Sequence, residues 1–160
     1  MEPVTLFLDF DGVLHPDDVY IADGRDVALK NGGVLFQHAA ALEEALLPFP
    51  TLRIVLSTSW VRVFGFSAAK ERLPLGLQGR VADATYHRRY SPEGWAGWSR
   101  YTQIHGHVTR RKLTRWLALD DDTTHWPATE RHRLVSPQPA VGLQPDDLEM
   151  LVTRLRALGV

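Results

Sequence analysis

Continuous runs of apolar residues mark the strands that this chain is expected to form. Residues 4–10 form a nearly unbroken apolar run, which is typical of a strand buried on both faces of a parallel sheet. A second run, residues 52–56, ends in hydroxyl side chains. Shorter apolar stretches predict further strands within residues 79–85, 115–122 and 132–137.

Apolar residues recur at helical spacing in the segments between these strands. The predicted helices cover residues 36–47, 66–73, 100–111 and 145–158. Pro48 and Pro50 end the first helix, and Pro145 opens the last, because a proline followed by acidic residues suits a helix N-terminus. Strands that alternate with helices indicate an α/β fold with a mostly parallel central sheet.

Two segments do not fit this alternation. Residues 17–36 have the pattern of a β-hairpin, with Asp23 and Gly24 in its turn. Residues 86–98 are irregular and predict a loop or small insertion, whose aromatic and arginine side chains suit either stacking on nucleic-acid bases or packing on the core. No repeat or linker divides the chain, so we expect a single domain over residues 1–160.

The composition narrows the class of protein. Of the 160 residues, 44% are hydrophobic, which is enough for a core and unlike a disordered tail. The 18 basic and 19 acidic residues nearly balance, which argues against a nonspecific coat for nucleic acid. Cysteine is absent, so disulfides and thiolate metal sites are excluded. The apolar run near the N-terminus is too short for a signal peptide or membrane span, so we expect a soluble cytoplasmic protein without a membrane partner.

Three predicted strands end in side chains that can do chemistry. Asp9 and Asp11 follow the first strand, three hydroxyl residues at 57–59 follow the second, and three aspartates at 120–122 follow the strand within 115–122. In parallel α/β sheets, ligands bind at the carboxyl ends of the strands. The sequence therefore predicts that these groups meet at one edge of the sheet.

Several carboxylates at one edge repel one another and would take up protons, unless a cation lies among them. Mg²⁺ prefers oxygen ligands and commonly shares its shell with phosphate oxygens, so we expect a Mg²⁺ site that also binds a phosphorylated substrate. Zinc fits the sequence less well, since there is no cysteine and no His-x-x-x-His pair. His105 and His107 are two residues apart, which puts them on different faces of their helix.

The spacing of Asp9 and Asp11 allows them to flank one ligand just beyond the strand end. One carboxylate can attack phosphorus to form an aspartyl-phosphate. The other can protonate the leaving oxygen and afterwards activate water. Gly12 permits a close approach of the backbone to the ligand.

The segments "LDFDGVL", "IVLSTS" and "WLALDDD" resemble, in this order, the first, second and fourth motifs of the haloacid dehalogenase (HAD) superfamily. The wording "LSTSW" and "ALDDD", with the small size of the chain, is more narrowly similar to the HAD domains associated with RNA-repair proteins. This resemblance implies a three-layer Rossmann-like fold. The short segments between the motifs predict little or no cap domain.

The resemblance also implies a role for each acidic residue. Asp9 would be the nucleophile and a metal ligand. Asp11 would be the general acid and base, and its backbone carbonyl would also bind the metal. Asp121 would complete the metal site, with Asp120 beside it.

On the phosphate side of the site, the resemblance leaves two alternatives open. Thr58 matches the phosphate-binding hydroxyl best, and Ser57 is the alternative. The third motif requires a basic residue near the start of the helix before the last acidic strand, and Arg100 fits that place. Lys112 is the only lysine nearby, but it lies close to the following strand. An arginine would grip phosphate oxygens bidentately.

These features together predict a Mg²⁺-dependent phosphatase that acts through an aspartyl-phosphate. A site without a large cap suits a nucleic-acid end or another large phosphoester. A dehalogenase would not need Asp11, and a phosphotransferase would normally use a cap to exclude water. The alternative from another class is a non-catalytic domain that binds metal and a phosphorylated partner.

Overall fold

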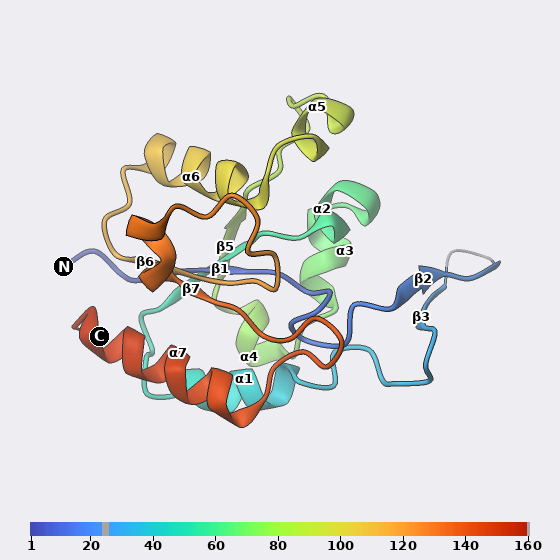
Figure 1. Ribbon diagram of the computed structural model, residues 1–160, viewed down its shortest axis with the longest axis horizontal. Coiled ribbons are helices and arrows are strands. Elements are labelled where there is room, and N and C mark those ends of the chain that lie inside the picture. The colour runs from blue at the N-terminus through green and yellow to red at the C-terminus, as the bar shows by residue number, and fades with distance from the viewer. Residues whose placement is uncertain (24–25, 160) are drawn as a thin grey trace.

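The computed structural model of the protein describes residues 1–23 and 26–159, and over these residues the chain forms a five-stranded parallel sheet (Figure 1). The strand order is β5-β4-β1-β6-β7. The strands are β1 (Thr5–Leu8), β4 (Arg53–Leu56), β5 (Val81–Ala84), β6 (Trp116–Leu119) and β7 (Leu134–Val135). Every residue of β1 and β6 is buried, as the continuous apolar runs predict for strands covered on both faces. The predicted α/β fold with a parallel sheet is confirmed.

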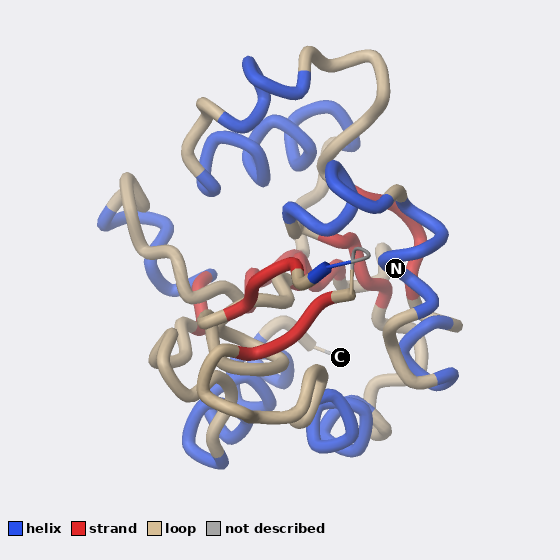
Figure 2. Tube along the Cα trace, turned by 90° about the vertical axis from the view of Figure 1, so that its right-hand side faces the viewer, coloured by secondary structure: helices blue, strands red, loops and turns tan. Residues whose placement is uncertain are grey.

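Helices cover both faces of the sheet and make it the middle one of three layers (Figure 1 and Figure 2). α6 (Arg100–Arg111) packs on one face, and α1 (Ala39–Leu46) and α7 (Pro145–Ala157) pack together on the other. Successive residues of β1 point to opposite layers. Phe7 therefore joins the hydrophobic cluster that contains α6 residues, and Leu6 joins the cluster that contains residues of α1 and α7.

The remaining helices are short. They are α2 (Ser59–Phe64), α3 (Phe66–Glu71), α4 (Leu75–Gln78), α5 (Pro92–Ala96) and the 3₁₀ helix η2 (Ala128–Arg133). α3 corresponds to the helix predicted over 66–73, and α5 gives the irregular segment 86–98 one turn of helix. Within residues 1–23 and 26–159, no helix has the length and apolar character that a bilayer crossing requires.

The first predicted helix, residues 36–47, starts later than expected. Phe36 has a φ of +59°, whereas helical residues need a φ near −63°. The backbone N–H of Phe36 donates a hydrogen bond to Nδ1 of His15 at 3.1 Å instead of joining the helix. The helix α1 therefore begins at Ala39.

The predicted hairpin forms a small sheet of its own. β2 (Val19–Ile21) and β3 (Val27–Leu29) pair antiparallel, and Figure 1 shows them projecting from the layered body on the side where β1 ends. The predicted turn at Asp23 and Gly24 extends outside the described residues. In the described part of the connection from β1 to α1, the β2–β3 hairpin, called the flap below, stands where a cap domain would be inserted.

Candidate active site

The three central strands end at the same level of the sheet. Leu8, the last residue of β1, is in register with the last residues of both β4 and β6. The residues that follow these strands are therefore neighbours: Asp9, Ser57 and Asp120. Backbone hydrogen bonds continue one residue past the strands, from Asp9 N to the last β6 carbonyl at 3.1 Å and from Ser57 N to Leu8 O at 2.8 Å. The parallel register thus brings the chemistry-bearing strand ends together.

Three aspartates form a carboxylate cluster at this edge. One oxygen from each of Asp9, Asp120 and Asp121 lies within 4.8 Å of the other two. Asp9 is only 4% exposed and Asp120 only 1%. Gly12 makes room for Asp121: its φ is +76°, and a Cβ at this position would overlap with the Asp121 carboxylate. The geometry thus agrees with the expectation that acidic groups from two strand ends lie close together.

The electrostatics of the carboxylate cluster call for a positive charge. Burial, together with the charges of Asp120 and Asp121, raises the pKa of Asp9 well above its usual value, although Arg100 opposes the rise. Burial raises the pKa of Asp120 from 3.8 to about 7, and it also raises the pKa of Asp121. Carboxylates this close to one another stay ionised together only when positive charge lies among them. With bonds of about 2.1 Å, adjacent oxygens around an octahedral Mg²⁺ lie about 3 Å apart and opposite ones about 4.2 Å, so the three carboxylate oxygens would have to move closer together to hold this ion.

Arg100 lies against the carboxylate cluster. It is the first residue of α6, which starts there because the side chain of Ser99 caps the helix. Its guanidinium approaches Asp120 Oδ2 at 3.2 Å and Asp9 Oδ1 at 3.7 Å, and it donates hydrogen bonds to the backbone carbonyl and, at 3.4 Å, to the hydroxyl of Ser57. Burial alone would lower the pKa of Arg100, but the carboxylates of Asp9 and Asp120 outweigh it and raise the pKa, so Arg100 carries its charge.

Lys112 lies outside this arrangement. It is the C-cap of α6, in the left-handed conformation with a φ of +54°. The 12 residues of α6 span about 18 Å between Arg100 and Lys112. Of the two basic residues considered from the sequence, the structure therefore brings only Arg100 to the carboxylate cluster.

The carboxylate of Asp11 contacts residues outside the carboxylate cluster. Its Oδ1 accepts a hydrogen bond from Nε1 of Trp60 at 2.8 Å and lies 2.8 Å from Nε2 of His15. Since Nδ1 of His15 accepts from the N–H of Phe36, the proton of a neutral His15 ring is on Nε2 and is donated to Asp11. Neither Trp60 nor His15 has a role in the site that is predicted above from the sequence. The only sequence signal for either was proximity to a strand end.

Ser57 and Thr58 are both buried at the end of β4. The hydroxyl of Ser57 faces Arg100, as described above. Thr58 is the N-cap of α2, and its Oγ1 accepts a hydrogen bond from Trp60 N at 3.3 Å. Thr58 thus has the helix-capping role that serine and threonine commonly have. The hydroxyls of Ser57 and Thr58 both stay candidates for phosphate binding.

Two small hollows border the site. One, of about 200 Å³, lies between the flap and α2 and is lined by residues that include Asp11, Tyr20 and Trp60. The other, of about 180 Å³, is lined by residues that include Arg62, Trp98 and Arg100. Trp98 is 46% exposed, whereas Trp95, on α5, is buried. The irregular segment 86–98 therefore both packs on the core and presents an aromatic ring near the site.

Comparison with known proteins adds one match. The family model described as "HAD domain in Swiss Army Knife RNA repair proteins" matches residues 5–148. This range contains the carboxylate cluster, Asp11, the hydroxyl residues and Arg100. A search of curated proteins gave no match.

Proposed function

The chain belongs to the family of HAD domains found in Swiss Army Knife RNA repair proteins, and from this premise we propose that it is a Mg²⁺-dependent phosphatase acting through an aspartyl-phosphate on Asp9. The observation that carries the proposal is the buried carboxylate cluster in contact with Arg100. Family membership supports a hydrolase of the phosphoryl-transfer type. The cluster supports Mg²⁺, which would supply positive charge to the phosphoryl oxygens and the ionised nucleophile.

In the proposed first step, Asp9 attacks the phosphorus of a phosphate monoester. Its Oδ1 accepts a hydrogen bond from Phe10 N at 2.8 Å and faces Arg100, which leaves Oδ2 for the attack. The bond between phosphorus and the ester oxygen breaks, and Asp11 gives its proton to that leaving oxygen. The product is an acyl phosphate on Asp9 and a free hydroxyl group.

In the proposed second step, water attacks the phosphorus of the acyl phosphate. Asp11 takes the proton of that water, the bond from phosphorus to Asp9 breaks, and inorganic phosphate leaves. Arg100 offsets the charge that develops on the phosphoryl oxygens in both steps, and the hydroxyl of Thr58 or Ser57 donates a hydrogen bond to them. Both catalytic aspartates return to their starting protonation states.

For the substrate, we propose the phosphorylated end of a nucleic acid. The flap leaves the site without a cap domain, which suits a large phosphoester. Arg62 and the exposed ring of Trp98 line the hollow beside Arg100, and such a pair can hold the backbone and a base of the terminal nucleotide. Cytoplasmic location is part of this proposal, because nothing in a chain without cysteine points to an oxidising compartment.

Turnover of matched substrates tests the substrate assignment. Release of phosphate from 3′- and 5′-phosphorylated oligonucleotides should exceed release from sugar phosphates. Activity confined to sugar phosphates would reject a nucleic-acid end. Trp98→Ala should raise KM for the oligonucleotide more than for a small aryl phosphate, since only the oligonucleotide offers a base for stacking.

Asp9→Asn tests the chemistry itself. Wild-type protein that is quenched with acid during turnover should retain a phosphoryl group on Asp9. The Asp9→Asn variant should lose both turnover and this phosphoryl group, while circular dichroism and thermal unfolding show a retained fold. Asp146→Asn, which changes an exposed aspartate of α7, is the matched control and should keep full turnover. A wild-type protein that binds Mg²⁺ and phosphorylated ligands but never turns them over would make the domain a binding module.

A further inference from the structure

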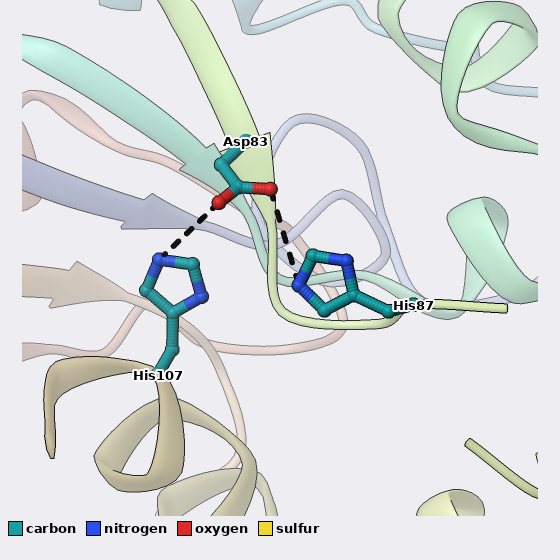
Figure 3. Close-up of side chains that lie close together, drawn as sticks. All are labelled: Asp83, His87 and His107. Atoms are coloured by element: carbon teal, nitrogen blue, oxygen red, sulfur yellow. Dashed lines mark ion pairs between the residues drawn. The ribbon is translucent and has the colours of Figure 1, made fainter. Parts of the chain in front are cut away.

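A second group of metal-ligating side chains lies outside the active site. It consists of Asp83 on β5, His87 in the turn that follows, and His107 on α6 (Figure 3). One ligand atom from each lies within 4.8 Å of the other two. β5 is separated from β1 by β4, and the group shares no residue with the carboxylate cluster.

The three side chains face one another without hydrogen bonds between them. Nε2 of His87 is 4.0 Å from Asp83 Oδ1, and Nε2 of His107 is 3.8 Å from Asp83 Oδ2. Hydrogen bonds of this kind are about 2.7–3.2 Å long, so both gaps are too wide. They lie close to the separation of about 3.4 Å between two ligands of a tetrahedral ion with bonds near 2.05 Å.

His107 gives this arrangement its weight. The residue is only 2% exposed, and its ring packs edge-on against Phe7 with 5.5 Å between ring centroids. Its Nδ1 is buried without a hydrogen-bond partner among the described residues. The described protein thus buries an imidazole that makes no hydrogen bond through either nitrogen, although such burial is costly. A ligand on Nε2 would satisfy that nitrogen, while Nδ1 would stay without a partner among the described residues.

We propose that Asp83, His87 and His107 bind a divalent cation of the Zn²⁺ type, with solvent at the remaining position. Two imidazole nitrogens and one carboxylate oxygen suit Zn²⁺, whereas the all-oxygen carboxylate cluster suits Mg²⁺. The ion joins β5 to α6 and so fixes the helix whose first residue is Arg100. The sequence disfavours zinc because it has no cysteine and no pair of histidines spaced on one helix, but the fold brings His87 next to His107.

Arg111 competes with a cation for Asp83. Its Nη2 lies 2.8 Å from Asp83 Oδ2, but its side chain is 60% exposed and can turn into solvent when an ion binds. Arg111 therefore supplies the positive charge beside Asp83 in the metal-free protein. Removing it with Arg111→Ala should tighten metal binding.

Co²⁺ is the probe for the test, because tetrahedral Co²⁺ absorbs visible light far more strongly than octahedral Co²⁺. The protein is titrated with Co²⁺ in excess Mg²⁺, which occupies the carboxylate cluster, and Zn²⁺ is then added to displace the Co²⁺. We expect one equivalent of strongly absorbing Co²⁺, its displacement by Zn²⁺, and a rise in thermal stability with Zn²⁺. Asp9→Asn should leave this signal unchanged, so failure of the phosphatase proposal is distinguishable from failure of this one.

His87→Asn is the decisive variant, because His87 is partly exposed and its replacement should not unfold the domain. It should weaken Co²⁺ and Zn²⁺ binding by at least about tenfold, which is the lower end of what even an outer-shell change costs. His105→Asn is the matched control: it removes an exposed histidine from α6, the helix that carries His107, and should bind as the wild type does. Equal binding by His87→Asn and wild type, or no strong absorption in the wild type, would overturn the proposal.

Discussion

In the absence of divalent cations, the free energy of unfolding of the protein should fall as the pH rises from about 4 to 7. One cause is Asp120, whose pKa is raised by burial from 3.8 to about 7. A carboxyl group whose folded-state pKa lies above its unfolded-state value binds more protons when the chain is folded. Its contribution to stability is complete below the unfolded-state pKa and is lost as the pH rises through the folded-state pKa.

The size of this effect follows from the shift in the pKa of Asp120. A rise from 3.8 to about 7 is a shift of about three units, and each unit corresponds to about 1.4 kcal/mol. Asp120 is only 1% exposed, so little solvent screening reduces this figure. The free energy of unfolding should therefore fall by about 4 kcal/mol between about pH 4 and 7. Asp9 and Asp121, whose pKa values are raised in the same direction, add to the fall.

Urea unfolding at a series of pH values, in EDTA and in excess Mg²⁺, measures this dependence. The amide in Asp120→Asn cannot ionise, so the part of the fall in EDTA that Asp120 contributes should disappear and the metal-free variant should be more stable than the wild type at pH 7. Glu149→Gln, which changes an exposed carboxylate of α7, should keep the wild-type dependence. A wild-type free energy of unfolding in EDTA that stays level or rises over this range would refute the reasoning, as would an unchanged slope in Asp120→Asn.

Three further substitutions test the geometry of the site. Arg100→Ala leaves the buried carboxylates without their partner and should cost about 3–5 kcal/mol in urea unfolding without Mg²⁺; a loss below about 1 kcal/mol would contradict the pairing. Gly12→Ala forces a Cβ into the Asp121 carboxylate and should weaken Mg²⁺ binding by about tenfold or more in calorimetry, so unchanged affinity would exclude Asp121 as a ligand. Trp60→Phe removes the Nε1–H donor to Asp11 and should lower kcat about fivefold, the value of one hydrogen bond, with KM unchanged; an equal change in KM would indicate altered substrate binding instead.

The sequence predicts most of this fold because local and tertiary signals agree in it. α6 has the bounds that the periodicity predicts, since Ser99 supplies a cap directly before the periodic segment. The meeting of Asp9 and Asp120 follows from a parallel sheet whose strands end in register. Each of these features depends on rules that act within a few residues or along a strand.

Features that depend on contacts between distant segments could not be predicted in the same way. The start of α1 is displaced because Phe36 bonds His15, 21 residues earlier in the chain. The choice between Arg100 and Lys112 required knowing which end of α6 faces the carboxylate cluster. His87 and His107 become neighbours only when α6 packs against β5. A hydrophobic pattern carries no information on such pairings.

The contacts of Asp11 bear on which of its oxygens handles the proton in the proposed reaction. Trp60 and His15 both donate to Oδ1, so that oxygen has two hydrogen bonds and little remaining capacity as a proton acceptor. A proton taken up by the carboxyl group therefore resides on Oδ2. The two donors also fix the rotation of the carboxylate, because Trp60 is buried on α2 and His15 is buried beside Phe36. The same pair of contacts thus sets the orientation of the acid and selects the oxygen that must face the leaving group.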